Sequence, residues 1–300
     1  MSLRDFAAIV ELRTKAVSVT SFCLGTLAAA WSENRFSWPV AVLALGAVLC
    51  VDMGTTAFNT FFDFDRRVDD ERFNREDDKI LVHRGFAPGW ALITGLALFA
   101  LAGLLGLALA ILRGIGVLFV GGVGMLVGLL YNFGPRPISH TPLGELAAGG
   151  FLGAVLFLLS FYLQAGRLTA EAGMRSLPLL LLVASILTVN NTCDIEGDRA
   201  AGRRTLSIVV GPRWGEALVY ACGVVAYGLT ALMVARGVLP VAAAATGAAS
   251  LAWTVCAYLR MHGRGFSHAT KGASMKAIVG VLVAYGAAMA SAMAWAMLRR

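Results

Sequence analysis

Long apolar runs alternate with short polar and charged segments along most of the 300 residues. Each run is close to the ~20 apolar residues that an α-helix needs to cross a bilayer. No segment between the runs is long enough to form a separate domain, so we expect one membrane domain over residues 1–300. The pattern predicts nine membrane-spanning helices near residues 16–31, 38–60, 87–112, 114–131, 143–164, 176–192, 214–235, 237–259 and 273–297.

Composition excludes a soluble protein. The chain is 58% hydrophobic and 14% charged, whereas soluble domains are nearer 45–50% apolar and about 25% charged. The five cysteines show no metal-binding spacing, and most lie within predicted spans, which indicates buried thiols. The sequence therefore predicts an all-α, polytopic membrane protein with lipid as its surroundings.

The net charge of +7 reflects membrane topology rather than nucleic-acid binding, because the basic residues lie in short loops. With the N-terminus inside, 18 of the 25 Lys and Arg residues lie on the cytoplasmic side, as the positive-inside rule requires. Acidic Asp5 and Glu11 argue against the alternative that the first apolar run is a cleaved signal peptide. Helices 1–4 and 5–8 look like two repeats, followed by helix 9.

A polar motif ends the sixth predicted helix. Asn190, Asp194 and Asp198 are spaced by four residues, so a continuing helix places them on one face. Polar groups at membrane depth are costly and usually functional. Their oxygen atoms suit Mg²⁺, which prefers a few carboxylates, several waters and a substrate phosphate.

A second copy of this spacing ends the second predicted helix, where Asn59 is followed by Asp63. Both helices run from outside to inside in the predicted topology, so both motifs reach the cytoplasmic face. Two such copies predict one binuclear or diphosphate-binding site. Upstream, Asp52 and Thr56 extend the same helix face. Asp52 is either a neutral carboxyl bonded to a neighbouring helix or a proton acceptor in the substrate cavity.

Basic residues surround both motifs on the same predicted face. Arg136 lies in a Pro- and Gly-containing turn after the fourth helix, where it either contacts an anionic ligand or anchors the topology. The charged loop from Asp63 to Asp78 is interpreted mainly as a solvated segment, with Asp69 as an exception. Basic donors and metal ions are the expected means of holding a diphosphate; the other basic residues near the motifs are Lys79, Arg84, Arg199, Arg203 and Arg204.

Four segments together resemble the UbiA superfamily of intramembrane prenyltransferases, and within it the MenA-like, naphthoquinone branch. The most specific similarity is in residues 190–206, which include Asn190, Asp194 and Asp198. The other similar segments are residues 59–69, 78–84 and the loop of 134–137 with 143–145. The resemblance covers nearly the whole chain and implies nine helices.

The resemblance implies Mg²⁺-dependent transfer of a prenyl group from a polyprenyl diphosphate to an aromatic quinone precursor such as 1,4-dihydroxy-2-naphthoate. The isoprenoid would lie in an apolar channel open to lipid, with the active site on the cytoplasmic side of the cell's inner membrane. Asp69 would join the metal ligands or act on the acceptor. The implied metal ligands are Asn59, Asp63, Asn190, Asp194 and Asp198; the implied diphosphate-binding residues are Asn59, Lys79, Arg84, Arg136, Asn190 and Arg204; the aromatic candidates for sheltering an allylic cation are Phe58, Phe62, Tyr131 and Phe133.

Three departures from the naphthoate branch concern the acceptor side. Cys193 stands where that branch usually has Arg, Asp52 and Thr56 stand where it often has His and Asn, and residues 11–15 lack the common Arg-Pro pair. These departures keep open a terpene cyclase that ionises and cyclises a prenyl diphosphate without an acceptor. A third alternative is a cation transporter that uses the carboxylates, although it needs neither paired motifs nor the basic cluster.

Overall fold

The computed structural model describes residues 2–66, 81 and 86–300, and this part of the chain contains helices and connecting loops without a β-strand. Asp69, Lys79 and Arg84 lie outside the described residues. Two short helices, α1 (Leu3–Ile9) and η1 (Leu12–Lys15), precede the long ones. The remaining principal elements are α2 (Ala16–Glu33), α3 (Trp38–Asp65), α5 (Gly89–Arg113), α6 (Gly116–Asn132), α7 (Gly144–Ala148), η3 (Gly149–Val155), α8 (Leu156–Ala165), α9 (Ala170–Cys193), α10 (Ile195–Ala200), α11 (Leu206–Val210), α12 (Pro212–Ala235), α13 (Ala242–Arg264) and α14 (Lys271–Leu298).

Seven described helical segments are long and apolar enough to cross a membrane. They are α3, α5, the continuous segment Gly144–Ala165, α9, α12, α13, and the segment His268–Leu298 that contains α14. The predicted all-α, polytopic class is therefore confirmed. The other two predicted spans correspond to α6, an apolar helix of 17 residues, and α2, an 18-residue helix that carries several Ser and Thr residues, so the number nine stays a prediction.

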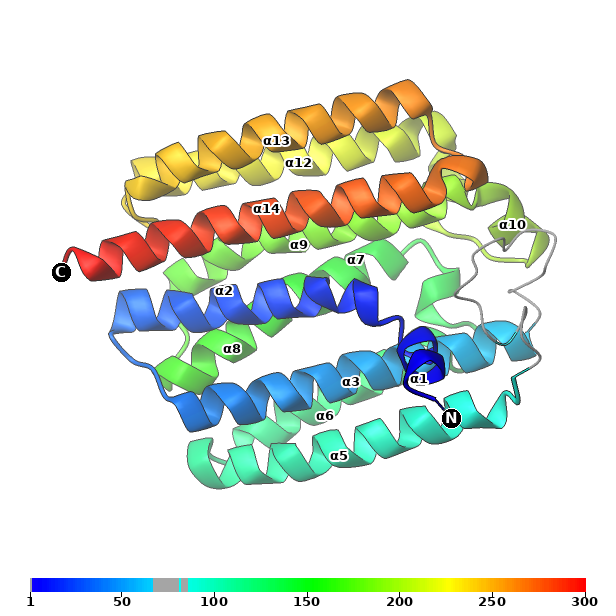
Figure 1. The fold of residues 1–300 in the computed structure, drawn as a ribbon, viewed down its shortest axis with the longest axis horizontal. Helices are drawn as coiled ribbons and strands as arrows, with labels where there is room; N and C mark the ends of the chain where they lie inside the picture. The colour runs from blue at the N-terminus through cyan, green and yellow to red at the C-terminus, as the bar shows by residue number, and fades with distance from the viewer. Residues whose placement is uncertain (1, 67–80, 82–85) are drawn as a thin grey trace.

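The long helices lie side by side in one bundle, as Figure 1 shows. The principal pairs are α3 with α5, α9 with α12, α13 with α14, and α2 with α8. Helix α9 is central, since 67% of the residues in its most apolar stretch are buried, against 17% in α5. Each motif helix thus packs closely on a later long helix, α3 on α5 and α9 on α12, as two repeats would.

Close backbone contacts position the segment Gly144–Ala165 against α9. A Cβ atom at Gly149 or Gly153 would overlap the backbone of Leu179 and Leu180. The same stretch of α9 contains Pro178. Small residues at helix crossings allow such approach within membranes, and here they hold the middle of α9 close to the segment Gly144–Ala165.

Replacing Gly25 by alanine is expected to destabilise the bundle. Its Cβ would overlap the carbonyl oxygen of Phe157, so α2 and α8 would have to separate. Overpacking of this kind costs about 1–3 kcal/mol. Thermal unfolding in detergent should show a lower Tm for Gly25→Ala, whereas the control Gly228→Ala, in open space within α12, should not lose stability. Equal Tm values for the two variants would contradict this packing.

Candidate functional site

Helix α3 carries a polar stripe that faces a large cavity. Asp52, Thr56, Asn59 and Asp63 all line this cavity, and Asp63 is buried. Their spacing of four, three and four residues puts them on one helix face, as the sequence predicts. The stripe runs from the interior of the bundle to the end of α3, where Asp63 lies.

The second motif lies at the end of α9 and the start of α10. Asn190, Asp194 and Asp198 line the same cavity. The helix does not continue unbroken as predicted, because α9 ends at Cys193 and Asp194 leaves helical geometry with φ −106° and ψ 12°. The backbone N–H of Asp194 still donates to Asn190, and that of Asp198 donates to Asp194. The break therefore redirects α10 while all three side chains stay at the cavity.

Arg203 joins the two motifs. Its Nη2 lies 2.7 Å from Asp63 Oδ1 and its Nη1 lies 3.2 Å from Asp198 Oδ1. Burial alone would lower the pKa of Arg203, but the carboxylates of Asp63 and Asp198 outweigh this effect and raise it. Residues 140 positions apart in the chain are thus held in one polar cluster, as the paired motifs predict.

Two residues at and just before the start of α14 contact Asp194. The Nζ of Lys271 lies 2.7 Å from Asp194 Oδ2, and the Nδ1 of His268 lies 3.2 Å from Asp194 Oδ1. Lys271 is buried. Sequence reasoning missed both residues, and it grouped Arg203 with its neighbours without assigning it a role. The signal for Arg203 is its place beside the second motif, whereas nothing local points to His268 or Lys271.

The carboxylate of Asp198 is only partly satisfied. Its Oδ2 atom is buried and has no hydrogen-bond partner among the described residues. Burial raises the pKa of Asp198 to about 6, although Arg203 acts in the opposite direction. A buried oxygen without a donor is costly, and a cation bound at this end of the cavity would satisfy it.

The oxygen donors fit a metal ion that arrives with a phosphate ligand. Within the described residues, no group of three His, Cys, Asp or Glu side chains is arranged to hold a metal by itself. Mg²⁺ is commonly bound through one or two carboxylates together with waters and substrate phosphates. The carboxylates of Asp63, Asp194 and Asp198, with the amides of Asn59 and Asn190, supply this kind of donor set.

Two of the basic residues that were predicted to bind the diphosphate lie outside the cavity. Arg136 and Arg204 are exposed and do not line the cavity. The backbone N–H of Arg204 donates to the carbonyl of His140 at 2.9 Å. Burial and the nearby charge of Arg203 lower the pKa of His140 to about 4, so this imidazole is neutral near pH 7. Of the three arginines that directly follow the second motif, Arg199, Arg203 and Arg204, it is Arg203 that contacts the carboxylates of Asp63 and Asp198.

The cavity has a volume of about 2040 Å³ and is polar at one end. Both motifs form the polar end, and apolar side chains of α5, α6 and α8 line much of the remainder, among them Leu109, Val117 and Leu159. Pockets for ordinary small molecules are about 300–1,000 Å³. The combination suits a ligand with a charged head and a long apolar tail.

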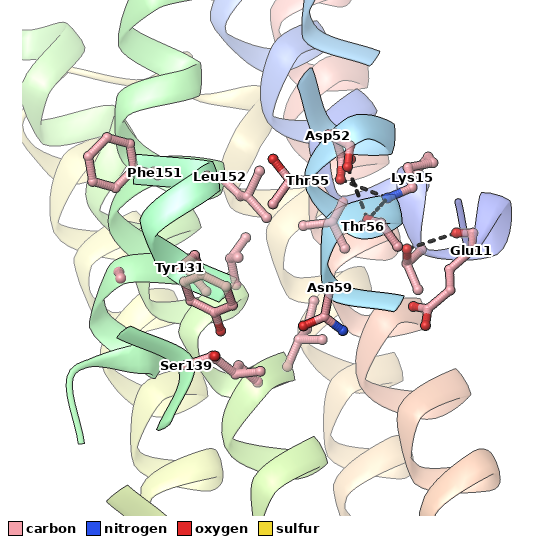
Figure 2. Close-up of a pocket in the computed structure, with 18 of the residues that line it drawn as sticks. Glu11, Lys15, Asp52, Thr55, Thr56, Asn59, Tyr131, Ser139, Phe151 and Leu152 are labelled. Atoms are coloured by element: carbon pink, nitrogen blue, oxygen red, sulfur yellow. Dashed lines mark hydrogen bonds and ion pairs between the residues drawn. The ribbon is translucent and has the colours of Figure 1, made fainter. Parts of the chain in front are cut away.

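Aromatic candidates for the polar end differ in position. Tyr131 lines the cavity and stands opposite Asn59 in Figure 2. Phe58 is buried against Phe99. Phe62 packs on Phe133, with the guanidinium of Arg66 over its ring at 5.5 Å. Among the four predicted residues, Tyr131 is therefore the one that lines this cavity.

A second polar cluster lies in the cavity wall, and Figure 2 shows it above Asn59 on α3. The Nζ of Lys15 lies 2.7 Å from Asp52 Oδ1 and 2.6 Å from Thr56 Oγ1. Asp52 is therefore bonded to η1, a neighbouring helical segment, and lines the cavity at the same time. Asp52 thus forms an ion pair with Lys15.

The sequence pattern of the UbiA prenyltransferase family matches residues 18–271. A similar curated protein is the 1,4-dihydroxy-2-naphthoate octaprenyltransferase of Bacillus subtilis (strain 168), which is 34% identical over 61% of this chain. The match spans 58% of the length of that relative.

Solved structures share the fold. The UbiA homologue of Aeropyrum pernix K1, without ligand, aligns with a TM-score of 0.66 at 21% identity, covering 95% of this chain and 98% of that one. The UbiA homologue of Archaeoglobus fulgidus bound to DMAPP and Mg²⁺ aligns with a TM-score of 0.65 at 17% identity, covering 96% and 99%. With the family pattern matched over most of its length, the chain belongs to the UbiA prenyltransferase family.

Proposed function

We propose that this protein is a Mg²⁺-dependent intramembrane prenyltransferase that transfers a polyprenyl group from its diphosphate to an aromatic quinone precursor of the 1,4-dihydroxy-2-naphthoate type. The observation that carries this proposal is the meeting of Asp63 and Asp198 at the polar end of a long apolar cavity, joined by Arg203. The similarity to a Bacillus subtilis naphthoate prenyltransferase supports the acceptor class.

The two motifs bind the head of the donor in this proposal. Asp63, Asp194 and Asp198, with the amides of Asn59 and Asn190, would hold Mg²⁺ against the diphosphate. When bound, Mg²⁺ neutralises the diphosphate and makes it a better leaving group. Arg203 orients the carboxylate of Asp63, and Lys271 orients that of Asp194, each through an ion pair of 2.7 Å.

The reaction replaces one bond of the prenyl group by another. The bond between the allylic carbon and the diphosphate oxygen breaks, and the same carbon forms a bond to the acceptor ring, which loses a proton. The ring of Tyr131 at the cavity wall is suited to stabilise the allylic cation by a cation–π contact. The apolar walls exclude water, which would otherwise capture the cation.

The proposed location is the cytoplasmic membrane, with the motif end toward the cytoplasm. Both motifs lie at one end of the bundle, near the end of α3 and at α10 in Figure 1. The predicted excess of Lys and Arg on this side supports the orientation.

The apolar part of the cavity is expected to control the length of the isoprenoid. Gly124 of α6 lines the cavity, and a Cβ added there meets nothing within 4 Å. A leucine at this position would occupy space meant for the tail. Gly124→Leu should lower kcat/KM for a long donor relative to farnesyl diphosphate by about tenfold or more.

Gly116 of α6 provides the matched control for this prediction. It also has open space but does not line the cavity, so Gly116→Leu should leave the ratio of kcat/KM values unchanged. Equal ratios in both variants would contradict the assignment of this wall to the isoprenoid.

Product analysis tests the proposed reaction. Membranes that contain the protein would receive Mg²⁺ and farnesyl or geranylgeranyl diphosphate, with and without 1,4-dihydroxy-2-naphthoate, before mass spectrometry. A prenylated naphthoquinol that forms only with the acceptor is the expected result. A cyclic terpene formed without acceptor would instead support the cyclase alternative, which the placement of Asp52 and Cys193 at the cavity keeps open.

A further inference from the structure

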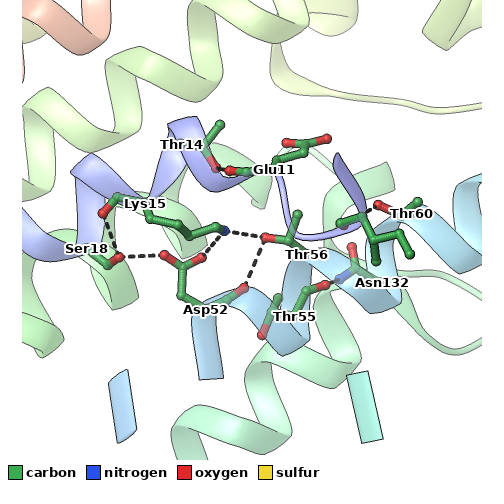
Figure 3. A network of polar contacts seen from close by, with 10 residues as sticks. Glu11, Thr14, Lys15, Ser18, Asp52, Thr55, Thr56, Thr60 and Asn132 are labelled. Carbon is green, nitrogen blue, oxygen red and sulfur yellow. Dashed lines mark hydrogen bonds and ion pairs between the residues drawn. The ribbon is translucent and has the colours of Figure 1, made fainter. Parts of the chain in front are cut away.

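The polar cluster of Lys15, Ser18, Asp52 and Thr56 has no place in diphosphate binding. Figure 3 shows the amine of Lys15 reaching between Asp52 and Thr56, while Ser18 reaches the other oxygen of Asp52. Asp52 and Asp63 are 11 residues apart on α3, which is about 16 Å along the helix axis. The cluster therefore lies deeper in the membrane domain than the motif carboxylates.

The cluster is built of buried charges that face the cavity. Lys15 is only 4% exposed, and the Asp52 side chain is 13% exposed. A buried ion pair gives little net stability over well-packed apolar residues. Lys15, Asp52 and Thr56 nevertheless line the cavity wall rather than a sealed helix interface. This placement indicates that the cluster contacts a ligand in the cavity.

Hydrogen-bonding capacity remains open in the cluster. An ammonium group has three donors, and contacts to Asp52 and Thr56 account for two of those of Lys15 in the described chain. Among the described residues, each oxygen of Asp52 receives one hydrogen bond, from Lys15 or Ser18, and a carboxylate oxygen can accept two. One hydroxyl group of a ligand could accept from the third N–H of Lys15 and donate to an oxygen of Asp52.

The charge of the pair favours a neutral partner. Lys15 and Asp52 compensate each other, so a ligand carboxylate would approach Asp52 without a net attraction from the pair. A phenolic hydroxyl carries no such penalty, and it can donate to Asp52 while it accepts from Lys15. Hydrogen bonds to charged groups are stronger than neutral ones, which makes this an effective anchor for an aromatic ring.

We propose that the Lys15–Asp52 pair binds a hydroxyl group of the aromatic acceptor and holds the ring on the membrane side of the diphosphate. This inference rests on the proposed prenyl transfer to an aromatic acceptor. The hydrogen bond to Asp52 increases the electron density of the ring, and the anchor orients the ring toward the polar end of the cavity.

The test compares a diol with its ether in two forms of the protein. The probes are 1,4-dihydroxy-2-naphthoate and its 1,4-dimethyl ether, which has no hydroxyl donor, and their dissociation constants are measured by competition in detergent. The wild-type protein should bind the diol about 10- to 100-fold more tightly. In Lys15→Met/Asp52→Leu this preference should vanish, while the dissociation constant for the non-cleavable donor farnesyl thiodiphosphate stays within twofold.

Replacing both charges together avoids leaving one buried and unpaired. The matched control is Arg167→Met/Glu33→Leu, which removes another ion pair, with Nη2 and Oε2 2.7 Å apart, that lies outside the cavity. This control should keep the preference for the diol. The wild-type comparison also tests the inference without any variant, so a poorly folded variant does not decide the outcome.

Three results would overturn the inference, and they distinguish its failure from failure of the proposed function. Equal binding of diol and ether by the wild-type protein, or an unchanged preference in the double variant, would refute the hydroxyl anchor while prenyl transfer itself remained measurable. Absence of any acceptor-dependent product from the wild-type protein would refute the proposed function, and the inference with it.

Discussion

Asp63→Asn is expected to lower the rate of prenyl transfer by about 1,000-fold, because in the proposed mechanism the change removes a charge that would hold the metal and diphosphate at the transition state. Stabilisation of this kind contributes several kcal/mol, and each 1.36 kcal/mol corresponds to a factor of ten in rate. The same loss is expected for Asp194→Asn. The measurement is single-turnover formation of prenylated product at saturating Mg²⁺.

Asp65→Asn is the matched control for this prediction. Asp65 lies two residues further along α3, is exposed and does not line the cavity. Its replacement should leave the rate within a factor of two to three, the usual range for a surface change. Full activity in both Asp63→Asn and Asp194→Asn would contradict the assigned role of the motifs.

Arg203→Met is the second change with a large expected effect, because it leaves two buried carboxylates without their shared partner. The Arg203 side chain is 11% exposed, and it contacts Asp63 and Asp198. Breaking a buried ion pair by removing one partner costs about 3–5 kcal/mol. Thermal unfolding in detergent without Mg²⁺ should therefore show a markedly lower Tm than that of the wild-type protein.

Added Mg²⁺ should restore part of this stability. A divalent ion at the polar end supplies positive charge to the same carboxylates, so Tm should rise more in Arg203→Met than in the wild-type protein. Arg213→Met, a change of an exposed residue at the start of α12, should show neither effect. Identical Tm values and Mg²⁺ responses for these two variants would contradict the bridging role of Arg203.

The neighbouring Arg204 offers a direct comparison between sequence and structure. The sequence resemblance implies that Arg204 contacts the diphosphate, whereas in the structure Arg203 reaches the carboxylates and Arg204 is exposed. Adjacent arginines in a loop cannot be told apart by hydropathy or spacing. Their directions depend on the backbone beyond α10, where the N–H of Arg203 bonds to Asp198 and that of Arg204 bonds to His140.

Much of the fold could be predicted because a bilayer imposes simple limits on length and polarity. The predicted spans 38–60 and 214–235 correspond to α3 (Trp38–Asp65) and α12 (Pro212–Ala235). The convergence of the motifs could also be predicted, since paired Asn-Asp spacings at the ends of two helices of the same direction reach one face. Helix α3 extends to Asp65, beyond its apolar run, and the polar residues Asn59 and Asp63 in this extension face the cavity.

The partners of the motif carboxylates could not be predicted, because they depend on long-range packing. Lys271 and Asp194 are separated by α12 and α13, and their contact arises from the packing of α14 against α9. Lys15 reaches Asp52 because η1 turns the chain just before α2. No local pattern in either segment distinguishes these lysines from ordinary positive-inside residues.

The central claim is that the two motifs form one diphosphate site, and binding of a non-cleavable donor tests it most directly. Farnesyl thiodiphosphate would be titrated by calorimetry, with and without Mg²⁺, into the wild-type protein, Asp63→Asn, Asp194→Asn and the double variant. We expect tight, Mg²⁺-dependent binding by the wild-type protein, a large loss in each single variant, and a double variant little worse than either, because the motifs act together. Full Mg²⁺-dependent affinity in either single variant would contradict a shared site.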